Sequence, residues 1–323
     1  MNAEIVWLTS HKAVEAVPVG GKGQGLLNLA KIGLPIPPGF IIPSAFFPPT
    51  TIDQIKEQLN GSTGNQVNWQ PIEAAYQQLQ QKNPAVAVRS SALAEDGPQH
   101  SFAGLHDTFL WVSGISNLLP KITACWASLF SKRAQAYRLE RQITAVPQMA
   151  VIVQQMVPAQ SSGVMMTLNP SNGDRSKIVI EATWGLGQPL VEGAITPDRF
   201  LLDKVTGQLI SSEIASKMTE LRPTHSPPPT VANQPVPPEK QTVPSLTDDQ
   251  LNQLWIYGRQ LETTVGTPQD IEFALADDKI YLLQSRPETY WQQQPQQPVN
   301  LPTKPIDQIV ATLANFGQKG GKR

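Results

Sequence analysis

The stretch 267–289 reads TPQDIEFALADDKIYLLQSRPET, which is two short alternating runs separated by a polar turn. Side chains two residues apart in a strand point to the same face. Asp270 and Glu272 therefore share one face of the first run, and Gln284 and Arg286 share one face of the second. This pattern predicts a β-hairpin that carries charged side chains along one side.

The register of this hairpin decides whether the polar pairs meet. Residues directly opposite each other share a face, so the connecting loop must hold an odd number of residues, most simply 277–279. We then expect Glu272 opposite Gln284 and Asp270 opposite Arg286. The other face is expected to be apolar, with Ile271, Phe273, Leu275, Tyr281 and Leu283.

Two interpretations of the polar face remain open from the residues alone. It is either a solvated face with an ordinary surface salt bridge, or the floor of a site for a magnesium-bound nucleotide. In the second case, carboxylates would hold the hard cation through oxygen and arginine would meet phosphate.

Composition excludes several classes of protein. The formal net charge of −1 over 323 residues gives no general attraction to nucleic acid or to a membrane. Cys125 is the single cysteine, which rules out an internal disulfide or a cysteine-rich metal site. The chain shows no apolar run long enough to span a membrane and no signal peptide. We expect a cytoplasmic protein.

The remaining sequence alternates strand and helix patterns. Strands are expected at 85–92, 148–157, 162–170 and 177–185, and helices at 24–32, 115–140 and 247–266. Thr247 suits the N-cap of the last helix, and Gly266 can end it. This order predicts an α+β or α/β fold. The proline-rich stretch 222–244 reads as an extended linker or loop.

Three loops could contact phosphate. GGKGQG, residues 20–25, combines glycines that allow close approach with the charge of Lys22; it lacks the Ser or Thr of a Walker A loop, and a plain turn is the alternative. Arg89 ends a strand beside two serines, and a small-residue loop follows at 101–104, for which a surface loop is the alternative.

Two further segments fit the same kind of site. The backbone of 154–157 could recognise the edge of an adenine ring, and Gly185 with Gly187 could let a loop approach a ligand. A core strand and a turn are the alternative interpretations of these segments.

The order of these segments is more specific than any one of them. Together they resemble the N-terminal ATP-binding domain of the pyruvate phosphate dikinase and phosphoenolpyruvate synthase family, which also occurs in rifampin phosphotransferases and glucan water dikinases. The segments that carry the resemblance are GGKGQGLLNLAKIGLPIPPGF, VRSSALAEDGPQHSFAGLHDTFL, MAVIVQQMVPAQSSGVMMTLNP, EATWGLGQPLVEGAITPD and the opening hairpin. They extend to about residue 290.

The resemblance implies an ATP-grasp-like, two-lobed domain with mixed β-sheets, in which ATP and Mg²⁺ are held between the lobes. It implies a first lobe at 1–145 with the glycine-rich and Arg-Ser-Ser loops, a second lobe at 146–290 with a proline-rich insertion at 222–246, and a partly disordered tail at 291–323.

The resemblance also implies roles for individual residues. Lys22, Arg89 and Arg286 would be catalytic phosphate contacts; Gly104 and Thr108 would lie in the closing loop. Gln154 would line the adenine pocket and Gln284 the phosphate end, while Asp270 and Glu272 would hold Mg²⁺.

The family passes a phosphoryl group to a histidine on a separate domain with a Gly-Gly-x-Thr-Ser-His motif. The four histidines here, His11, His100, His106 and His225, have no such context. We therefore expect an ATP-dependent phosphotransferase domain that donates to a phosphohistidine carrier in trans. A catalytically inactive ATP- or AMP-binding regulatory module is the alternative. Two departures from the family pattern are Leu105 in place of Gln and Gln188 in place of Glu.

Overall fold

The computed structural model describes residues 4–9, 17–46, 67–80, 85–93, 96–97, 100–101, 108–140, 147–224 and 230–293. The chain divides into two compact units, Met1–Glu288 and Thr289–Arg323. Within the second unit, the described residues include one short helix, α8 (Tyr290–Gln293). Most of the predicted tail at 291–323 lies outside the described residues.

The first sheet of the larger unit has the strand order β1-β2-β7-β3-β6, with all pairs antiparallel. Its strands are β1 (Val6–Trp7), β2 (Gly39–Ile42), β3 (Ala85–Ala92), β6 (Thr108–Ser113) and β7 (Met149–Gln155). β7 is the central strand and is buried along its whole length, as expected for an apolar, β-branched run. The predicted lobe boundary at residue 145 placed this strand in the second lobe. The backbone hydrogen bonds of β7, however, lie within the first sheet.

The second sheet has the order β11-β10-β9-β8-β14-β15 and is also antiparallel. Its strands are β8 (Ser161–Met166), β9 (Lys177–Trp184), β10 (Asp198–Asp203), β11 (Leu209–Glu213), β14 (Gln269–Ala276) and β15 (Lys279–Pro287). The α+β class with two sheets is confirmed. Among the described residues both sheets are antiparallel rather than mixed. A small hairpin joins β4 (Asp96–Gly97) and β5 (His100–Ser101).

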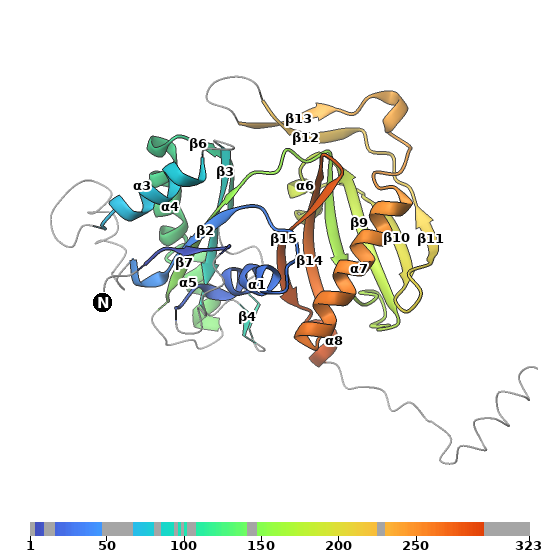
Figure 1. Ribbon diagram of the computed structural model, residues 1–323, viewed down its shortest axis with the longest axis horizontal. Helices are drawn as coiled ribbons and strands as arrows, with labels where there is room; N and C mark the ends of the chain where they lie inside the picture. Colours follow the sequence, from blue (N-terminus) through green and yellow to red (C-terminus); the bar gives the residue numbers. More distant parts are fainter. Residues whose placement is uncertain are drawn as a thin grey trace, which may run out of the picture. The chain divides into compact units, whose positions relative to one another are not determined.

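Helices pack on both sheets (Figure 1). α3 (Gln70–Leu79) and α4 (Ile115–Ser128) pack on the first sheet, in a core that includes Tyr76 and Trp126. α7 (Asp248–Val265) lies across the second sheet, and its Leu254 joins a core with Phe273. Thr247 caps α7 through a capping box with Gln250, and Gly266 ends it with a φ of 81°, as predicted.

The predicted long helix at 115–140 is two helices. α5 (Lys132–Glu140) follows α4 after a short break, and the Ser131 hydroxyl accepts a hydrogen bond from the Ala134 amide at 3.2 Å. A serine at this position satisfies an amide at the start of a helix, and so favours a new start over continuation. The other short elements are η1 (Ser44–Phe46), α6 (Gln188–Val191) and η2 (Pro238–Lys240).

The glycine-rich segment forms a helix instead of a phosphate-binding loop. α1 (Gly20–Lys31) starts at Gly20, four residues earlier than predicted. A Cβ added at Gly20 would collide with the backbone of Ser91 on β3, and one at Gly25 would collide with the carbonyl of Ser285 on β15. The glycines therefore allow α1 to lie against both sheets at once. Leu26 and Leu29 of α1 belong to the same core as Phe273.

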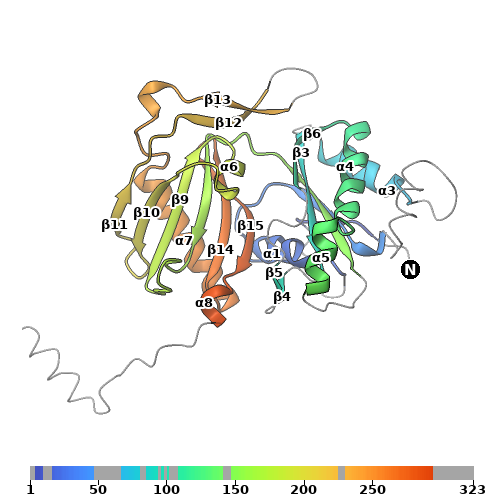
Figure 2. The ribbon, with the colours of Figure 1, turned by 180° about the vertical axis from the view of Figure 1, so that it is seen from behind.

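The proline-rich stretch is largely an ordered hairpin. β12 (Thr219–Pro223) pairs with β13 (Val231–Pro235), and residues 225–229 lie outside the described residues. Leu221 forms a parallel bridge to Gly185 at the end of β9. Figure 2 shows the hairpin at one end of the second sheet. The expectation of an extended linker is wrong, because backbone pairing and this bridge hold the segment in place.

Candidate functional site

A cavity of about 740 Å³ opens between the two sheets. Its lining comes from α1, β3, β6 and β7 on one side and from β8, α6, β14 and β15 on the other. This volume lies within the range of roughly 300–1,000 Å³ that is typical of small-molecule sites. The cavity has a polar end and an apolar end, which different elements build.

The hairpin β14–β15 provides the floor of the polar end. Asp270 lies opposite Arg286 and Glu272 opposite Gln284, as predicted. The extra residue, however, is not in a three-residue loop. It is Leu283, a bulge on β15 opposite the step from Glu272 to Phe273. The turn itself has two central residues, Asp277 and Asp278, both with positive φ, as in a type I′ turn.

The bulge changes which side chains face the cavity. Phe273 pairs with Leu282 and Ala274 with Tyr281. The prediction that Tyr281 and Leu283 join the apolar face of Ile271 is therefore wrong. They pack in a cluster with Ala274, and Leu283 lines the cavity. The extra residue on β15 shifts every side chain between itself and the turn to the opposite face.

Arg89 joins the two sheets across the polar end. From β3, its Nη2 donates to Glu272 Oε2 at 2.9 Å and to Gln284 Oε1 at 2.7 Å, and its Nη1 donates to the carbonyl of Leu283 at 2.7 Å. Leu283 is the bulged residue that interrupts the register of the hairpin. Its carbonyl oxygen accepts the hydrogen bond from Arg89. Arg89 is 9% exposed, and these bonds compensate for much of its desolvation.

A second arginine closes the same end. Arg286 donates from Nε and Nη2 to Asp270 Oδ2 at 2.9 and 2.7 Å. Burial raises the pKa of Asp270, Arg286 opposes that shift, and the charge of Glu272 adds to it. Arg286 and Glu272 line the cavity, whereas Asp270 stands behind Arg286 and is not among the lining residues. Asp270 thus orients Arg286 directly.

Three further predicted residues line the same cavity. Lys22 of α1, Thr108 of β6 and Gln154 of β7 all line the cavity. The Gln154 side chain also donates to the carbonyl of Pro37 at 3.3 Å and is 2% exposed. Gly104 and Leu105 lie outside the described residues.

The apolar end is built by the segment that follows β7. Met156, Val157 and Ala159 line the cavity together with Leu186. They form one cluster with Leu221 of the β12–β13 hairpin. The sequence pointed to 154–157 but not to the hairpin, because nothing in a proline-rich stretch indicates which surface it will cover.

Helix α6 and its C-cap contribute a polar pair, of which sequence reasoning identified Gln188 but missed Glu192. Gln188 and Glu192 both line the cavity, and Gln188 Nε2 donates to Glu192 Oε1 at 2.8 Å. The carboxylate that position 188 lacks is therefore present one helical turn later. The spacing of four residues is the signal that could have identified this pair.

Metal ligation at the polar end would use oxygen donors. Among the residues that the structure describes, no group of three or more His, Cys, Asp or Glu side chains could hold a metal. The oxygens of Glu272 and Gln284 nevertheless suit Mg²⁺, which commonly takes one or two protein ligands and completes its shell with phosphate and water. The donor set therefore fits a magnesium nucleotide better than a free metal.

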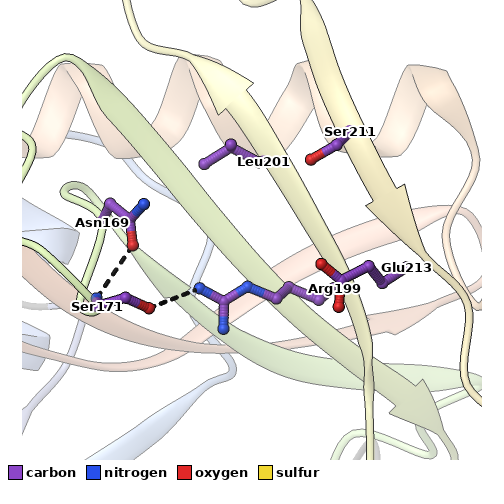
Figure 3. A pocket seen from close by; sticks show the side chains of 6 residues that line it. All are labelled: Asn169, Ser171, Arg199, Leu201, Ser211 and Glu213. Atoms are coloured by element: carbon purple, nitrogen blue, oxygen red, sulfur yellow. Dashed lines mark hydrogen bonds between the residues drawn. The ribbon is translucent and has the colours of Figure 1, made fainter.

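A smaller cavity of about 360 Å³ lies on the same face of the second sheet. Arg199 lies three strands from Glu272 through successive cross-strand partners, about 14 Å away at the usual strand spacing. Figure 3 shows the Arg199 guanidinium directed toward Ser171, to which it donates at 3.2 Å. Arg199 also pairs with Glu181 at 3.0 Å.

The model of one protein family matches most of the chain. Pyruvate phosphate dikinase, AMP/ATP-binding domain, aligns with residues 51–304. The chain belongs to this family. Its match includes the whole floor hairpin and β3, while α1 with Lys22 precedes the matched residues.

Curated relatives of this AMP/ATP-binding family are longer proteins. The chain is 37% identical over 297 residues to the prodigiosin synthesizing transferase PigC of Serratia marcescens, covering 88% of this chain and 33% of that protein. It is 36% identical to a probable phosphoenolpyruvate synthase of Methanothermobacter thermautotrophicus, with coverages of 84% and 44%. A rifampicin phosphotransferase of Bacillus subtilis is 34% identical, with coverages of 90% and 36%.

Solved structures resemble this family member only distantly. A D-alanine–D-alanine ligase from Helicobacter pylori aligns with a TM-score of 0.35 and 10% identity, covering 83% of this chain and 54% of that chain. Within the described part of the chain, no helix is both long and apolar enough to cross a membrane.

Proposed function

We propose that this chain is the ATP-dependent phosphotransferase domain of a phosphoenolpyruvate synthase or pyruvate phosphate dikinase type of protein. It transfers a phosphoryl group from Mg-ATP to a histidine on a separate domain or polypeptide. One observation carries the proposal: in an AMP/ATP-binding family, Lys22, Arg89 and Arg286 line one cavity together with Glu272 and Gln284.

The polarity of the cavity gives the orientation of the nucleotide. The triphosphate lies at the arginine-rich end and the base at the end formed by Met156, Val157 and Leu186. Along β14, the floor runs from Ala274 at the apolar end to Asp270 at the polar end. Four strand residues span about 13 Å, which suits a nucleotide extended along this strand.

Phosphoryl transfer depends on in-line positioning and on positive charge around the migrating group. Lys22, Arg89 and Arg286 supply that charge, and Thr108, at the start of β6, lines the same cavity. The acceptor imidazole brings the nucleophilic nitrogen, so this domain needs no nucleophile of its own.

Of the two expected magnesium ligands, Glu272 lines the cavity and Asp270 does not. Glu272 and Gln284 are therefore the proposed ligands, and Asp270 supports them by holding Arg286. Bound Mg²⁺ would neutralise charge on the phosphates. Glu272 and Gln284 both accept hydrogen bonds from Arg89 in this structure. Carboxylate and amide oxygens carry further lone pairs, so Glu272 and Gln284 would hold Mg²⁺ while Arg89, beside them, would meet phosphate oxygens.

The experiment that tests this function follows the label from ATP. The chain is incubated with Mg²⁺ and with ATP labelled at the β or γ phosphate, with and without an added histidine domain from this family. We expect label on the added domain and none on the same domain with its histidine replaced by alanine. Tight ATP binding with no transfer or hydrolysis under any of these conditions would contradict the proposal and favour the inactive regulatory module.

A further inference from the structure

The hairpin β12–β13 packs against residues that line the apolar end of the cavity. Leu221 packs in one cluster with Met156, Val157 and Leu186, all of which line the cavity. The Leu186 amide donates to the carbonyl of Leu221 at 2.9 Å. A side chain and a backbone group of one hairpin residue thus both support the wall.

A buried ion pair fixes the chain on both sides of this hairpin. Lys217, two residues before β12, donates from Nζ to Asp198 Oδ1 at 2.6 Å. The amide and hydroxyl of Ser245, between the hairpin and α7, donate to Asp198 Oδ2 at 2.8 and 2.7 Å. The amide of Ala215 also donates to Oδ1, at 3.0 Å.

The side chains of Asp198 and Lys217 are 0% and 1% exposed. Removing two charges from water is costly unless geometry and hydrogen bonds are both satisfied. Asp198 uses both oxygens, and Lys217 also donates to the carbonyl of Ala215 at 3.0 Å. The pair therefore admits little displacement, and it sets where the chain enters and leaves the hairpin relative to β10.

This pair does not touch the polar end. Asp198 lies two residues before Phe200 in β10 and therefore shares the face that packs against α7. Arg199 points to the other face, which it shares with Glu272. The hairpin, which the pair holds at both ends, connects Asp198 to the apolar end of the cavity.

We infer that Asp198 and Lys217 are positioning residues for the nucleobase, a conclusion that rests on the proposed function. By fixing the β12–β13 hairpin, they hold Leu221 and Leu186 against the base end of the cavity. Their contribution falls on the base and leaves the affinity for the triphosphate unchanged.

Two ligands separate these contributions: ATP and inorganic tripolyphosphate, which lacks the base and ribose. Their dissociation constants are measured by calorimetry with Mg²⁺ on the full chain and on two variants, Asp198→Asn and Leu221→Ala. We expect each variant to weaken ATP binding by roughly tenfold, a usual effect of altering an apolar subsite. Tripolyphosphate binding should stay unchanged in both.

Leu202→Ala is the matched control. Leu202 is a buried leucine of β10, the strand of Asp198, and it packs on the α7 side of the sheet, away from the cluster of Leu221. It should lower the melting temperature without changing the ratio of the two dissociation constants. Circular dichroism establishes folding, and Leu221→Ala decides the question if Asp198→Asn does not fold.

An unchanged ratio in folded Leu221→Ala, or an equal loss of both ligands, would overturn the inference alone. A wild-type chain that binds neither ligand would overturn the proposed function and the inference with it.

Discussion

Two acidic side chains of the second sheet are buried beside basic partners, yet their surroundings differ. Asp198 is enclosed, and both of its oxygens accept hydrogen bonds from Lys217, Ala215 and Ser245. Asp270 receives both bonds of Arg286 on one oxygen, and its partner lines a cavity. The first cluster is closed on itself, whereas the second presents charge to a ligand.

The difference shows how a buried charge can be assigned a role from its partners. An ion pair whose polar atoms are all hydrogen-bonded within the protein holds in place the elements that it joins. A pair whose cation faces a cavity, beside further charges such as Glu272, is placed where a ligand can meet it. Removing one partner should therefore mainly affect stability in the first case and mainly affect phosphate chemistry in the second.

The largest expected effect is on stability at the closed pair. Lys217→Met leaves the carboxylate of Asp198 buried without its cation, which typically lowers the free energy of unfolding by about 3–5 kcal/mol. Urea denaturation without nucleotide measures this change. Lys177→Met is the control, because Lys177 pairs with Asp203 at a half-buried site, where we expect a loss of at most about 1 kcal/mol. Equal losses in the two variants would remove the distinction drawn here.

The next effect is on phosphoryl transfer at the open cluster. Glu272→Gln keeps an acceptor for Arg89 but removes the charge proposed to hold Mg²⁺. We expect the transfer rate to fall by roughly a hundredfold or more, as is usual when a group that stabilises transition-state charge is lost. Stability should change little.

Glu181→Gln provides a stringent comparison for that experiment. Glu181 lies in the same cross-strand row as Glu272 and pairs with Arg199 beside the smaller cavity. We expect its transfer rate to match wild type. A comparable loss at position 181 would mean that the whole sheet face, and not its polar end alone, takes part in the reaction.

The smallest effect is a dependence of stability on pH at Asp270. Burial raises the pKa of Asp270 in the folded chain. Below its unfolded pKa of about 3.9 the carboxyl is protonated in both states. As the pH rises above that value, the unfolded chain releases the proton first, so the free energy of unfolding falls until the folded pKa is passed.

The variant Asp270→Asn isolates this contribution. The stability of wild type relative to Asp270→Asn should decrease over that pH interval, measured by urea denaturation with EDTA and without nucleotide. An increase over the same interval would mean that Arg286 outweighs burial and lowers the pKa of Asp270.

Much of the polar end follows from local sequence. The alternation of Asp270 with Glu272 and of Gln284 with Arg286 places each pair on one face, and their meeting requires one odd residue. Both a three-residue loop and a two-residue turn with a bulge satisfy that condition. The structure shows that the hairpin has the bulge. The bulge places Tyr281 and Leu283 on the face opposite to the predicted one, and the Leu283 carbonyl accepts a hydrogen bond from Arg89.

The glycine-rich segment shows a second limit. Glycine permits both a phosphate loop and the close packing of a helix, because it lacks the Cβ that would prevent either. Which use applies depends on Ser91 and Ser285, more than sixty residues away in the chain. Although residues 20–25 form a helix and not the predicted loop, Lys22 still lines the cavity, because α1 packs against both sheets.

By itself, then, the sequence determined the secondary structure of the floor hairpin, the cap and end of α7, and the residue types of the polar end, because these depend on periods of two and on local capping. The tertiary structure decided which sheet received β7, how α1 packs, and that a proline-rich stretch supports residues that line the cavity. Those outcomes depend on contacts between segments distant in the chain, such as Asp198 with Lys217 and Ser245, whose geometry no local pattern encodes.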